Sequence, residues 1–318
     1  MTRRRDLLML TGAAALWPLS AYAQQGKVVK IGFLTVKPQV EPHWGLVRSA
    51  LRDLGYAEGM NVQFDLRAAD TLDLLATLAA ELVRMKVDVI VALRTPAAHA
   101  AKGATSVTPI VILSVADPVG AGIISSLSRP GSNITGVGSS GTDTHVKALD
   151  FLCEIIPGAR RVAAILDARD PFSKPLRTHL QEMARTRSLQ IDVALVQRDD
   201  QVDQVVAGVA AQKPDAAIVQ GVLPPRTVEM LRKYRIPTSG TNISYAEAGA
   251  VVMYFADVGA MCRKVAVYID RIVKGASPAD LPVEEPTKFN LIVNARAAKA
   301  LGIKIPQELR LRADKVIE

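Results

Sequence analysis

The chain is 318 residues long, and 49% of its residues are hydrophobic while 22% are charged. This ordinary globular composition excludes disordered and collagen-like classes, and the length supplies enough apolar material for two hydrophobic cores. The formal net charge is +8, but Lys and Arg are scattered and no basic cluster is interleaved with aromatic residues. We therefore expect a solvated basic surface and no nucleic-acid partner.

The N-terminus has the three parts of an export signal. Residues 3–5 are arginines, Leu7 to Leu19 form a short apolar segment, and Ala21-Tyr22-Ala23 is a small-x-small cleavage site. An apolar run of about 13 residues is too short to cross about 30 Å of hydrocarbon. No cysteine follows the cleavage site to carry a lipid anchor. We predict that residues 1–23 are a cleaved signal peptide and that the mature protein is periplasmic.

Within this segment, Arg4-Arg5-Asp6-Leu7-Leu8 resembles the twin-arginine pattern of bacterial signals. That pattern is an address read by a receptor, and proteins that fold before export often carry it. Export by the Sec route remains the alternative.

Strand and helix patterns alternate after the signal. Short runs of largely β-branched residues predict strands at Val28–Leu34, Val62–Leu66, Val87–Leu93 and Ile110–Val115. All but the second are nearly continuous apolar runs, which are typical of buried parallel strands. Between them, apolar residues recur at helical spacing. They are Trp44, Val47, Leu51 and Leu54, then Leu72, Leu75, Leu78, Leu82 and Val83.

The same alternation restarts near Arg161. Strands are expected at Val162–Leu166, Ile191–Val196, Ala216–Val219 and near Ile236, and helices at Pro175–Arg187, Val202–Gln212 and Pro225–Lys233. A strand at Val251–Tyr254, a long helix at Val258–Lys274 and a last strand at Asn290–Val293 follow. Because each open sheet builds its own core, the two arrays predict an α/β protein with two doubly wound parallel-sheet lobes. We place their joint in the Gly/Ser-rich stretch from Gly136 to Thr142.

No sequence motif indicates an enzyme, a cofactor or a metal. Gly120-Ala121-Gly122 follows a predicted strand, but Ser125 stands where a dinucleotide fingerprint needs Gly or Ala. There is no GxSxG, Walker or HExxH motif, and the four histidines are isolated. A catalytic triad assembled by the fold alone remains open. We expect Cys153 and Cys262 to be two buried thiols rather than a disulfide, with no metal site around them.

Polar residues recur where predicted strands end. In open α/β sheets ligands bind at the carboxyl ends of the strands, because loops and helix N-termini with unpaired N–H groups converge there. The residues in such positions are Thr35, Arg94, Thr95, Pro96, Ser114, Asp117, Asp167, Gln220, Gly221, Thr241 and Asn242. We expect them to line a binding cleft. The alternative for Thr95 and Asp117, which both precede a proline, is a purely structural role at a helix start.

Several long motifs resemble the family of ABC transporter substrate-binding proteins that includes the tryptophan-binding, TrpX-like type. They are LGYAEG at 54–59, VDVIVA at 87–92 with TPAA at 95–98, ADPVGAG at 116–122, RPGSNITG at 129–136 and PVEEPTKF at 282–289. The similarity covers nearly the whole chain after the signal.

The resemblance implies a type I periplasmic-binding-protein fold, whose two lobes are joined by three crossings. By that analogy the chain crosses near Ser139, near Tyr254 to Asp257 and near Val283, and the helix at 258–274 packs on the first lobe. The first lobe is then 28–139 plus 256–282, and the second is 140–255 plus 283–318. Ala97, Ser139, Ser140, Tyr254 and Asp257 join the expected ligand-binding residues.

The resemblance further implies a monomeric receptor without catalysis that binds a small carboxylate or an aromatic, amino-acid-like ligand and delivers it to an ABC transporter permease. Relatives tend to have a small residue before Thr-Pro-Ala, whereas this chain has Arg94. A cation beside helix N-terminal amides predicts an acidic ligand group; the alternative is an Arg94 that faces solvent or a structural carboxylate. The competing functions are an exported hydrolase and a sugar-responsive regulator, although the regulator would need a helix-turn-helix where this chain has its export signal.

Overall fold

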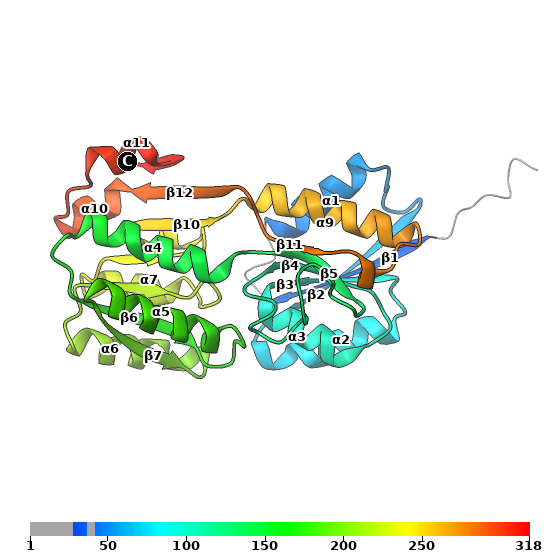
Figure 1. Ribbon diagram of the computed structural model, residues 1–318, viewed down its shortest axis with the longest axis horizontal. Coiled ribbons are helices and arrows are strands. Elements are labelled where there is room, and N and C mark those ends of the chain that lie inside the picture. Colours follow the sequence, from blue (N-terminus) through cyan, green and yellow to red (C-terminus); the bar gives the residue numbers. More distant parts are fainter. Residues whose placement is uncertain (1–27, 37–41) are drawn as a thin grey trace, which may run out of the picture.

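The computed structural model describes residues 28–36 and 42–318, which form two α/β lobes, each built on one sheet (Figure 1). The first sheet has six strands in the order β11-β5-β4-β3-β1-β2. Their bounds are β1 Val29–Val36, β2 Val62–Ala69, β3 Val89–Leu93, β4 Ile110–Val115, β5 Ile134–Gly138 and β11 Val283–Glu284. Every neighbouring pair in this sheet is parallel.

The second sheet has seven strands in the order β13-β12-β10-β9-β8-β6-β7. Their bounds are β6 Arg161–Asp167, β7 Gln190–Val196, β8 Ala216–Val219, β9 Thr238–Gly240, β10 Val252–Ala256, β12 Phe289–Asn294 and β13 Lys315–Ile317. All neighbours are parallel except β10 and β12, which run antiparallel. The two-lobed α/β architecture expected from the sequence is thus confirmed.

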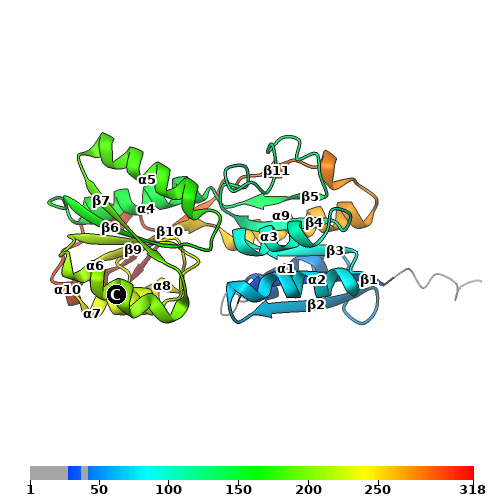
Figure 2. The ribbon, with the colours of Figure 1, turned by 90° about the horizontal axis from the view of Figure 1, so that it is seen from below.

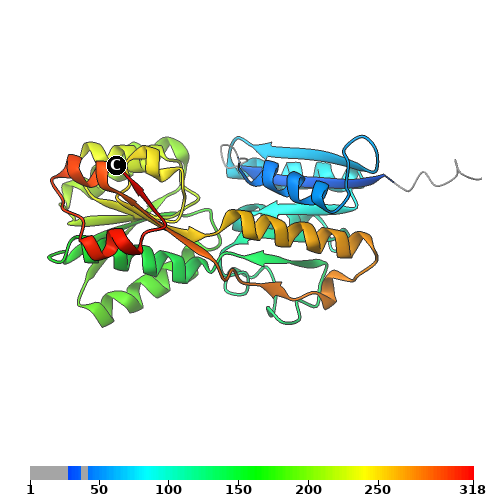
Figure 3. The same cartoon turned by 90° about the horizontal axis from the view of Figure 1, so that it is seen from above.

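Helices cover both faces of the first sheet. Helices α1 (His43–Asp53) and α9 (Val258–Val273) share one core with the strands, while α2 (Leu75–Arg84) and α3 (Arg94–Ala104) share the other (Figures 2 and 3). Strand β3 shows why its run is apolar throughout. Successive side chains point to opposite faces, so Val89 and Val91 enter the first core while Ile90 and Ala92 enter the second.

The second sheet is covered in the same way. One face carries α4 (Gly141–Ile155), α5 (Ser173–Arg187), α10 (Ala295–Leu301) and α11 (Gln307–Arg312). The other carries α6 (Val202–Ala211), α7 (Arg226–Lys233) and α8 (Tyr245–Ala248). Three short 3-10 helices, at Leu72–Leu74, Asp199–Gln201 and Pro278–Asp280, complete the described elements.

The chain passes between the lobes three times, from β5 to α4, from β10 to α9 and from β11 to β12 (Figure 1). Helix α9 follows a second-lobe strand, yet it packs against α1, β4 and β5 of the first lobe. Two boundaries differ from the expectation. Ala256, assigned to the first lobe, ends β10 in the second sheet. Residues 283–284 were assigned to the second lobe, but they form β11 beside β5 in the first sheet, so this crossing comes after Glu284.

The stretch from Gly136 to Thr142, expected to be a joint, contains more regular structure than its composition suggests. Its first residues belong to β5 and its last to α4. Gly136 lies between two strands, opposite Ile112 of β4 and Val283 of β11. Glycine occupies this position because the neighbouring backbone approaches closely, and not because the chain turns there.

None of the helices in the described part of the chain is long and apolar enough to cross a membrane. Both cysteines are free thiols; Cys262 is buried, whereas Cys153 is only partly buried. Among the described residues no cluster of three His, Cys, Asp or Glu side chains is arranged to hold a metal ion. The predicted signal peptide, residues 1–23, lies outside the described residues.

Candidate ligand-binding site

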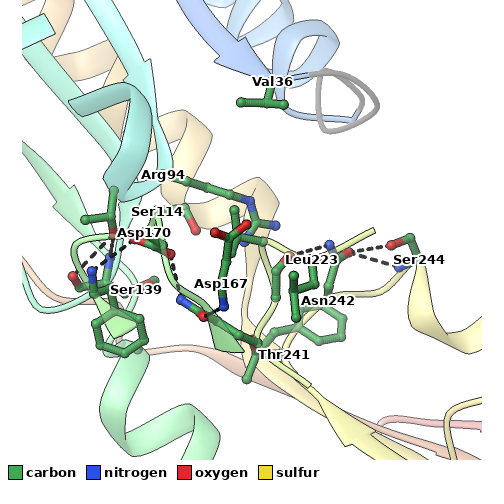
Figure 4. Close-up of a pocket in the computed structure, with 18 of the residues that line it drawn as sticks. Val36, Arg94, Ser114, Ser139, Asp167, Asp170, Leu223, Thr241, Asn242 and Ser244 are labelled. Carbon is green, nitrogen blue, oxygen red and sulfur yellow. Dashed lines mark hydrogen bonds between the residues drawn. The ribbon is translucent and has the colours of Figure 1, made fainter. Parts of the chain in front are cut away.

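A cavity of about 320 Å³ lies between the two lobes, and both contribute its walls (Figure 4). It is lined by residues at the ends of β1, β2, β3 and β4 in the first lobe and of β6, β8 and β9 in the second. This is the edge at which parallel strands present their carboxyl ends, where ligands bind in open α/β sheets. Its volume is at the lower end of the range for small-molecule pockets.

The structure brings many of the residues singled out from the sequence to this cavity. Those that line it are Arg94, Thr95, Ser114, Asp167, Gln220, Gly221, Thr241 and Asn242, together with Ser139 at the first crossing. They come from both lobes, so the strand-end pattern located the two walls of one site.

Seven other expected site residues do not line the cavity, and most have a structural partner instead. Thr35 is fully buried, and Pro96 and Ala97 are buried in α3. The Asp117 carboxylate accepts a hydrogen bond from Gly120 N at 2.9 Å. Asp257 caps α9 by accepting from Ala260 N at 2.7 Å.

The last two of these residues support the crossings between the lobes. Ser140 donates from both N and Oγ to Glu285 Oε2, each at 2.7 Å, which ties the first crossing to the third. The Tyr254 ring stacks on Phe289 at 5.5 Å. Both residues therefore hold the hinge, and neither reaches the cavity.

Arg94 crosses the cavity from the first lobe. It is the first residue of α3 and has a left-handed backbone with φ of 68°, a conformation that costs a non-glycine residue energy and often occurs at functional sites. The side chain extends toward the second lobe, where Nη1 lies 3.4 Å from the position a Cβ would take on Gly221 (Figure 4). The guanidinium thus comes within van der Waals distance of the second lobe at Gly221.

The Arg94 guanidinium has no partner for one of its donors. Its Nε is buried without a hydrogen-bond partner among the described residues, and burial lowers the pKa of Arg94. A buried donor left unpaired is costly, and buried charges are normally paired. The arrangement therefore favours an anionic group that enters the cavity and completes the pairing.

Two acids of the second lobe that line the cavity, Asp167 and Asp199, are already engaged with another arginine. Arg169 Nε lies 3.1 Å from Asp167 Oδ1, and Arg169 Nη2 lies 2.9 Å from Asp167 Oδ2. Arg169 also reaches Asp199 Oδ1 at 2.7 Å. This ion cluster fixes the loop after β6 at the edge of the cavity, because a two-point arginine–carboxylate pair sets orientation as well as distance.

Asp170, in the same loop, is held only by neutral donors. Oδ1 accepts from Phe172 N at 3.0 Å, and Oδ2 accepts from Gln220 Nε2 at 2.7 Å (Figure 4). The residue is only 5% exposed. Burial, reinforced by the charge of Asp167, raises the pKa of Asp170 to about 7, although the two donors and Arg94 oppose the shift.

This carboxyl group makes stability depend on pH. Unfolded, Asp170 loses its proton near pH 4, whereas the folded protein keeps it until about pH 7. The folded state binds more protons in that interval, so this contribution to stability is full below pH 4 and is lost as pH rises to 7. Asparagine has one acceptor oxygen where Phe172 N and Gln220 Nε2 both donate. We therefore expect Asp170→Asn to lower the melting temperature at pH 4.5, and to lower it less or to raise it at pH 8, where the wild-type carboxylate is charged. Equal shifts at both pH values, measured by calorimetry, would contradict the assignment.

His145 forms part of the floor of the cavity. Its Nδ1 lies 2.6 Å from Gly141 O, and its Nε2 lies 3.4 Å from Thr241 Oγ1. Burial lowers the pKa of His145 to about 4, so the ring is neutral at physiological pH, with Nδ1 as donor and Nε2 as acceptor. It links the start of α4 to the second-lobe strand ends.

Much of the remaining surface of the cavity is apolar and comes from both lobes. The side chains are Val36, Leu72, Val258 and Met261 in the first lobe, and Phe172, Leu223, Ile243 and Phe255 in the second. A cavity with this apolar surface and with Arg94, whose Nε has no hydrogen-bond partner among residues 28–36 and 42–318, suits a small molecule with an anionic group and a hydrophobic body.

Sequence reasoning missed Asp170, His145, Phe172 and Phe255. Asp170 lies three residues after the strand-end Asp167, so extending the search by one loop turn would have found it. His145 was treated as isolated because α4 had not been predicted. For the two phenylalanines the sequence carries no signal that separates a cavity wall from a core.

Comparison with known proteins identifies relatives of this chain. A family model described as ABC transporter substrate binding protein matches residues 37–317. The chain is 26% identical over 277 residues to a tyrosine-binding protein of Clostridioides difficile (strain R20291), covering 84% of this chain and 77% of that protein.

Solved structures show the same fold. An ABC domain in complex with L-Trp from Streptococcus pneumonia has a TM-score of 0.84 at 24% identity, covering 91% of this chain and 99% of that one. A ligand-free, open substrate-binding protein with adhesive properties from Clostridium difficile has a TM-score of 0.65 at 25% identity, covering 92% and 99%. The type I periplasmic-binding-protein fold implied by the sequence motifs is confirmed. The chain belongs to the family of ABC transporter substrate-binding proteins.

Proposed function

We propose that this protein is the exported receptor of an ABC importer and that it binds a small carboxylate with an aromatic or other apolar body, such as an aromatic amino acid, between its lobes. The observation that carries the proposal is the buried Nε of Arg94 in the interlobe cavity, which has no hydrogen-bond partner in the described part of the chain. The ligand carboxylate pairs with Arg94, and its apolar body contacts the hydrophobic surface that both lobes supply.

Two comparisons support the ligand class. One relative is described as a tyrosine-binding protein, and one structural neighbour is a complex with L-Trp. Both ligands named there join a carboxylate to an aromatic ring. The TM-score is also higher with the L-Trp complex than with the ligand-free, open protein at nearly equal coverage, which supports a closed arrangement of the lobes here.

The proposed mechanism is hinge closure. Ligand binds one lobe of an open form, adds contacts from the other lobe and shifts the equilibrium toward the closed form, which a permease recognises. In this role the signal peptide directs export, cleavage after Ala23 releases the mature protein, and the protein acts as a monomer in the periplasm. It performs no chemistry on its ligand.

A matched ligand panel tests the proposal. Benzoate, phenylacetate, L-phenylalanine, L-tyrosine and L-tryptophan are compared with the neutral or cationic analogues phenylacetamide and tyramine, and with glucose. We expect at least one aromatic carboxylate to stabilise the protein, by about 2.7 kcal/mol at 100 times its dissociation constant. The amide and the amine should have no comparable effect.

Three results would contradict the proposal. They are binding of phenylacetamide as tight as that of phenylacetate, stabilisation by glucose alone, and no binding by any carboxylate. NMR of the ligand after prolonged incubation separates a receptor from an exported hydrolase, because a receptor returns its ligand unchanged.

A further inference from the structure

Asp170 is a buried acid that has no role in the proposed binding mechanism. It lines the same cavity as Arg94, and its two oxygens already accept hydrogen bonds from Phe172 N and Gln220 Nε2. Gln220 cannot turn to release it, because its Oε1 accepts from Asp167 N and Ser173 Oγ, each at 2.8 Å. The carboxyl group is therefore fixed in the wall of the cavity proposed to hold the ligand.

The charges that face Asp170 come from several elements. Asp167 and Arg169 lie on its own loop, and Arg169 is held by Asp167 and Asp199. Arg94 faces it from α3, and it is a cation without an ion pair among the described carboxylates. His145 on α4 is neutral, and the buried Tyr245 hydroxyl on α8 donates to the carbonyl oxygens of Gln220 and Leu223. Of these groups, Arg94 alone offers a positive charge that a ligand can neutralise.

We propose that Asp170 is a proton-binding site coupled to the ligand: when a ligand carboxylate pairs with Arg94, the Asp170 carboxyl takes up one proton. The inference rests on the proposed function, because it requires an anionic ligand on Arg94. The free Arg94 guanidinium favours the ionised form of Asp170. When the ligand carboxylate pairs with Arg94, that positive charge is neutralised, and the buried Asp170, next to the negative Asp167, holds a proton more tightly. The proton comes from solvent, so the bound complex carries one positive charge more than ligand and free protein would together.

The linkage has a defined pH range. In the free protein the pKa of Asp170 is about 7, and the bound ligand raises it further. Below about pH 6 the group is protonated in both states and no proton is exchanged. Between pH 7 and the higher pKa of the bound state, binding takes up a proton, so the dissociation constant increases with pH by up to about tenfold per pH unit. Above the bound-state pKa this dependence ends.

Calorimetry on the wild-type protein measures this uptake directly. Phenylacetate and L-phenylalanine both join a phenyl ring to a carboxylate, and the amino acid alone also carries an ammonium group. Titrating each at pH 7.5 in phosphate and in Tris gives the number of protons exchanged from the two apparent enthalpies. We expect an uptake of about half a proton or more per ligand with both compounds. In Asp170→Asn, which carries no charge at any of these pH values, uptake should vanish and the affinity should not vary between pH 6 and 8.5. Asp203→Asn, which removes an exposed carboxylate paired with Arg226 outside the cavity, should retain the wild-type uptake.

A second measurement needs no variant. In protein labelled with 13C at the aspartate carboxyl carbons, the chemical shift of one resonance should change with a midpoint near pH 7. Adding phenylacetate should move that midpoint to higher pH. Binding without proton exchange overturns the inference and leaves the proposed function intact. Proton release with L-phenylalanine also overturns it, because Asp170 would then pair with the ligand ammonium. Unchanged uptake in Asp170→Asn assigns the proton to another group. Failure of every carboxylate to bind overturns the proposed function itself.

Discussion

Arg94→Gln is expected to weaken the binding of an aromatic carboxylate by about 30-fold or more, since losing one partner of a buried charge pair costs roughly 2–5 kcal/mol. Glutamine retains a polar side chain that extends as far as the arginine Nε, but it carries no charge. The guanidinium forms no ion pair with a described protein carboxylate. At pH 6 the Asp170 carboxyl, whose pKa of about 7 Arg94 lowers, is already largely protonated, so the ligand-free variant should fold as well as the wild type. Isothermal titration with L-tyrosine or L-tryptophan at pH 6 measures the loss.

Arg52→Gln is the matched control. Arg52 is exposed near the end of α1 away from the cavity, and its guanidinium contacts only Ser49 Oγ among the described residues. This variant should bind with wild-type affinity. If Arg94→Gln also keeps wild-type affinity, or if the preferred ligand proves to be uncharged, Arg94 does not receive the ligand carboxylate.

Gly136→Ala should lower the free energy of unfolding by about 3 kcal/mol or more, through backbone strain and overpacking together. Gly136 has φ of 133°, and a Cβ there would lie 2.2 Å from Ile112 O and 2.6 Å from Ile112 N. Both atoms belong to the backbone of the neighbouring strand β4, so they cannot rotate away as a side chain would. Urea unfolding followed by circular dichroism measures the change.

Gly208→Ala supplies the contrasting control. Gly208 lies in the interior of α6, and no heavy atom outside that helix and its chain neighbours lies within 4 Å of its ideal Cβ position. Alanine there should stabilise the protein by about 0.5–1 kcal/mol, because it has the higher helix propensity. Destabilisation of less than about 1 kcal/mol by Gly136→Ala would mean that β4 and β5 do not pack as described.

The fold was largely predictable because its strands carry strong local signals. Strand β3 is apolar on both faces, and only a strand buried between two helical layers needs that pattern. Strand β5 was missed because Gly136 and Gly138 resemble a loop, while the need for them arises from Ile112 and Glu285, which are distant in sequence. Strand β11 has only two residues, too few to carry a periodic pattern.

The candidate site was predictable only where it coincides with strand ends. Arg94, Thr241 and Asn242 follow strands directly, so the topology alone brings them to the cavity. Asp170 becomes buried through Gln220, which lies 50 residues away, and no local pattern encodes that contact. Tyr254 and Asp257 were predicted to bind ligand by analogy with the crossings of related proteins. In the structure the Tyr254 ring stacks on Phe289, and Asp257 caps α9.

The position of α9 in the chain constrains the order in which the protein can assemble during synthesis. Val265, Ala266 and Ile269 of α9 share a core with Phe33 and Leu51, although more than 200 residues separate them. When residues 1–250 have been synthesised, the chain contains five of the six strands of the first sheet. On the face of that sheet that α1 and α9 cover in the described structure, α1 is then present and α9 is not. The other part of the face is still apolar surface in contact with water, which favours association with other chains. Completion of the first lobe is therefore a late event in biosynthesis, and the chain has to be kept from aggregating until its last quarter has emerged.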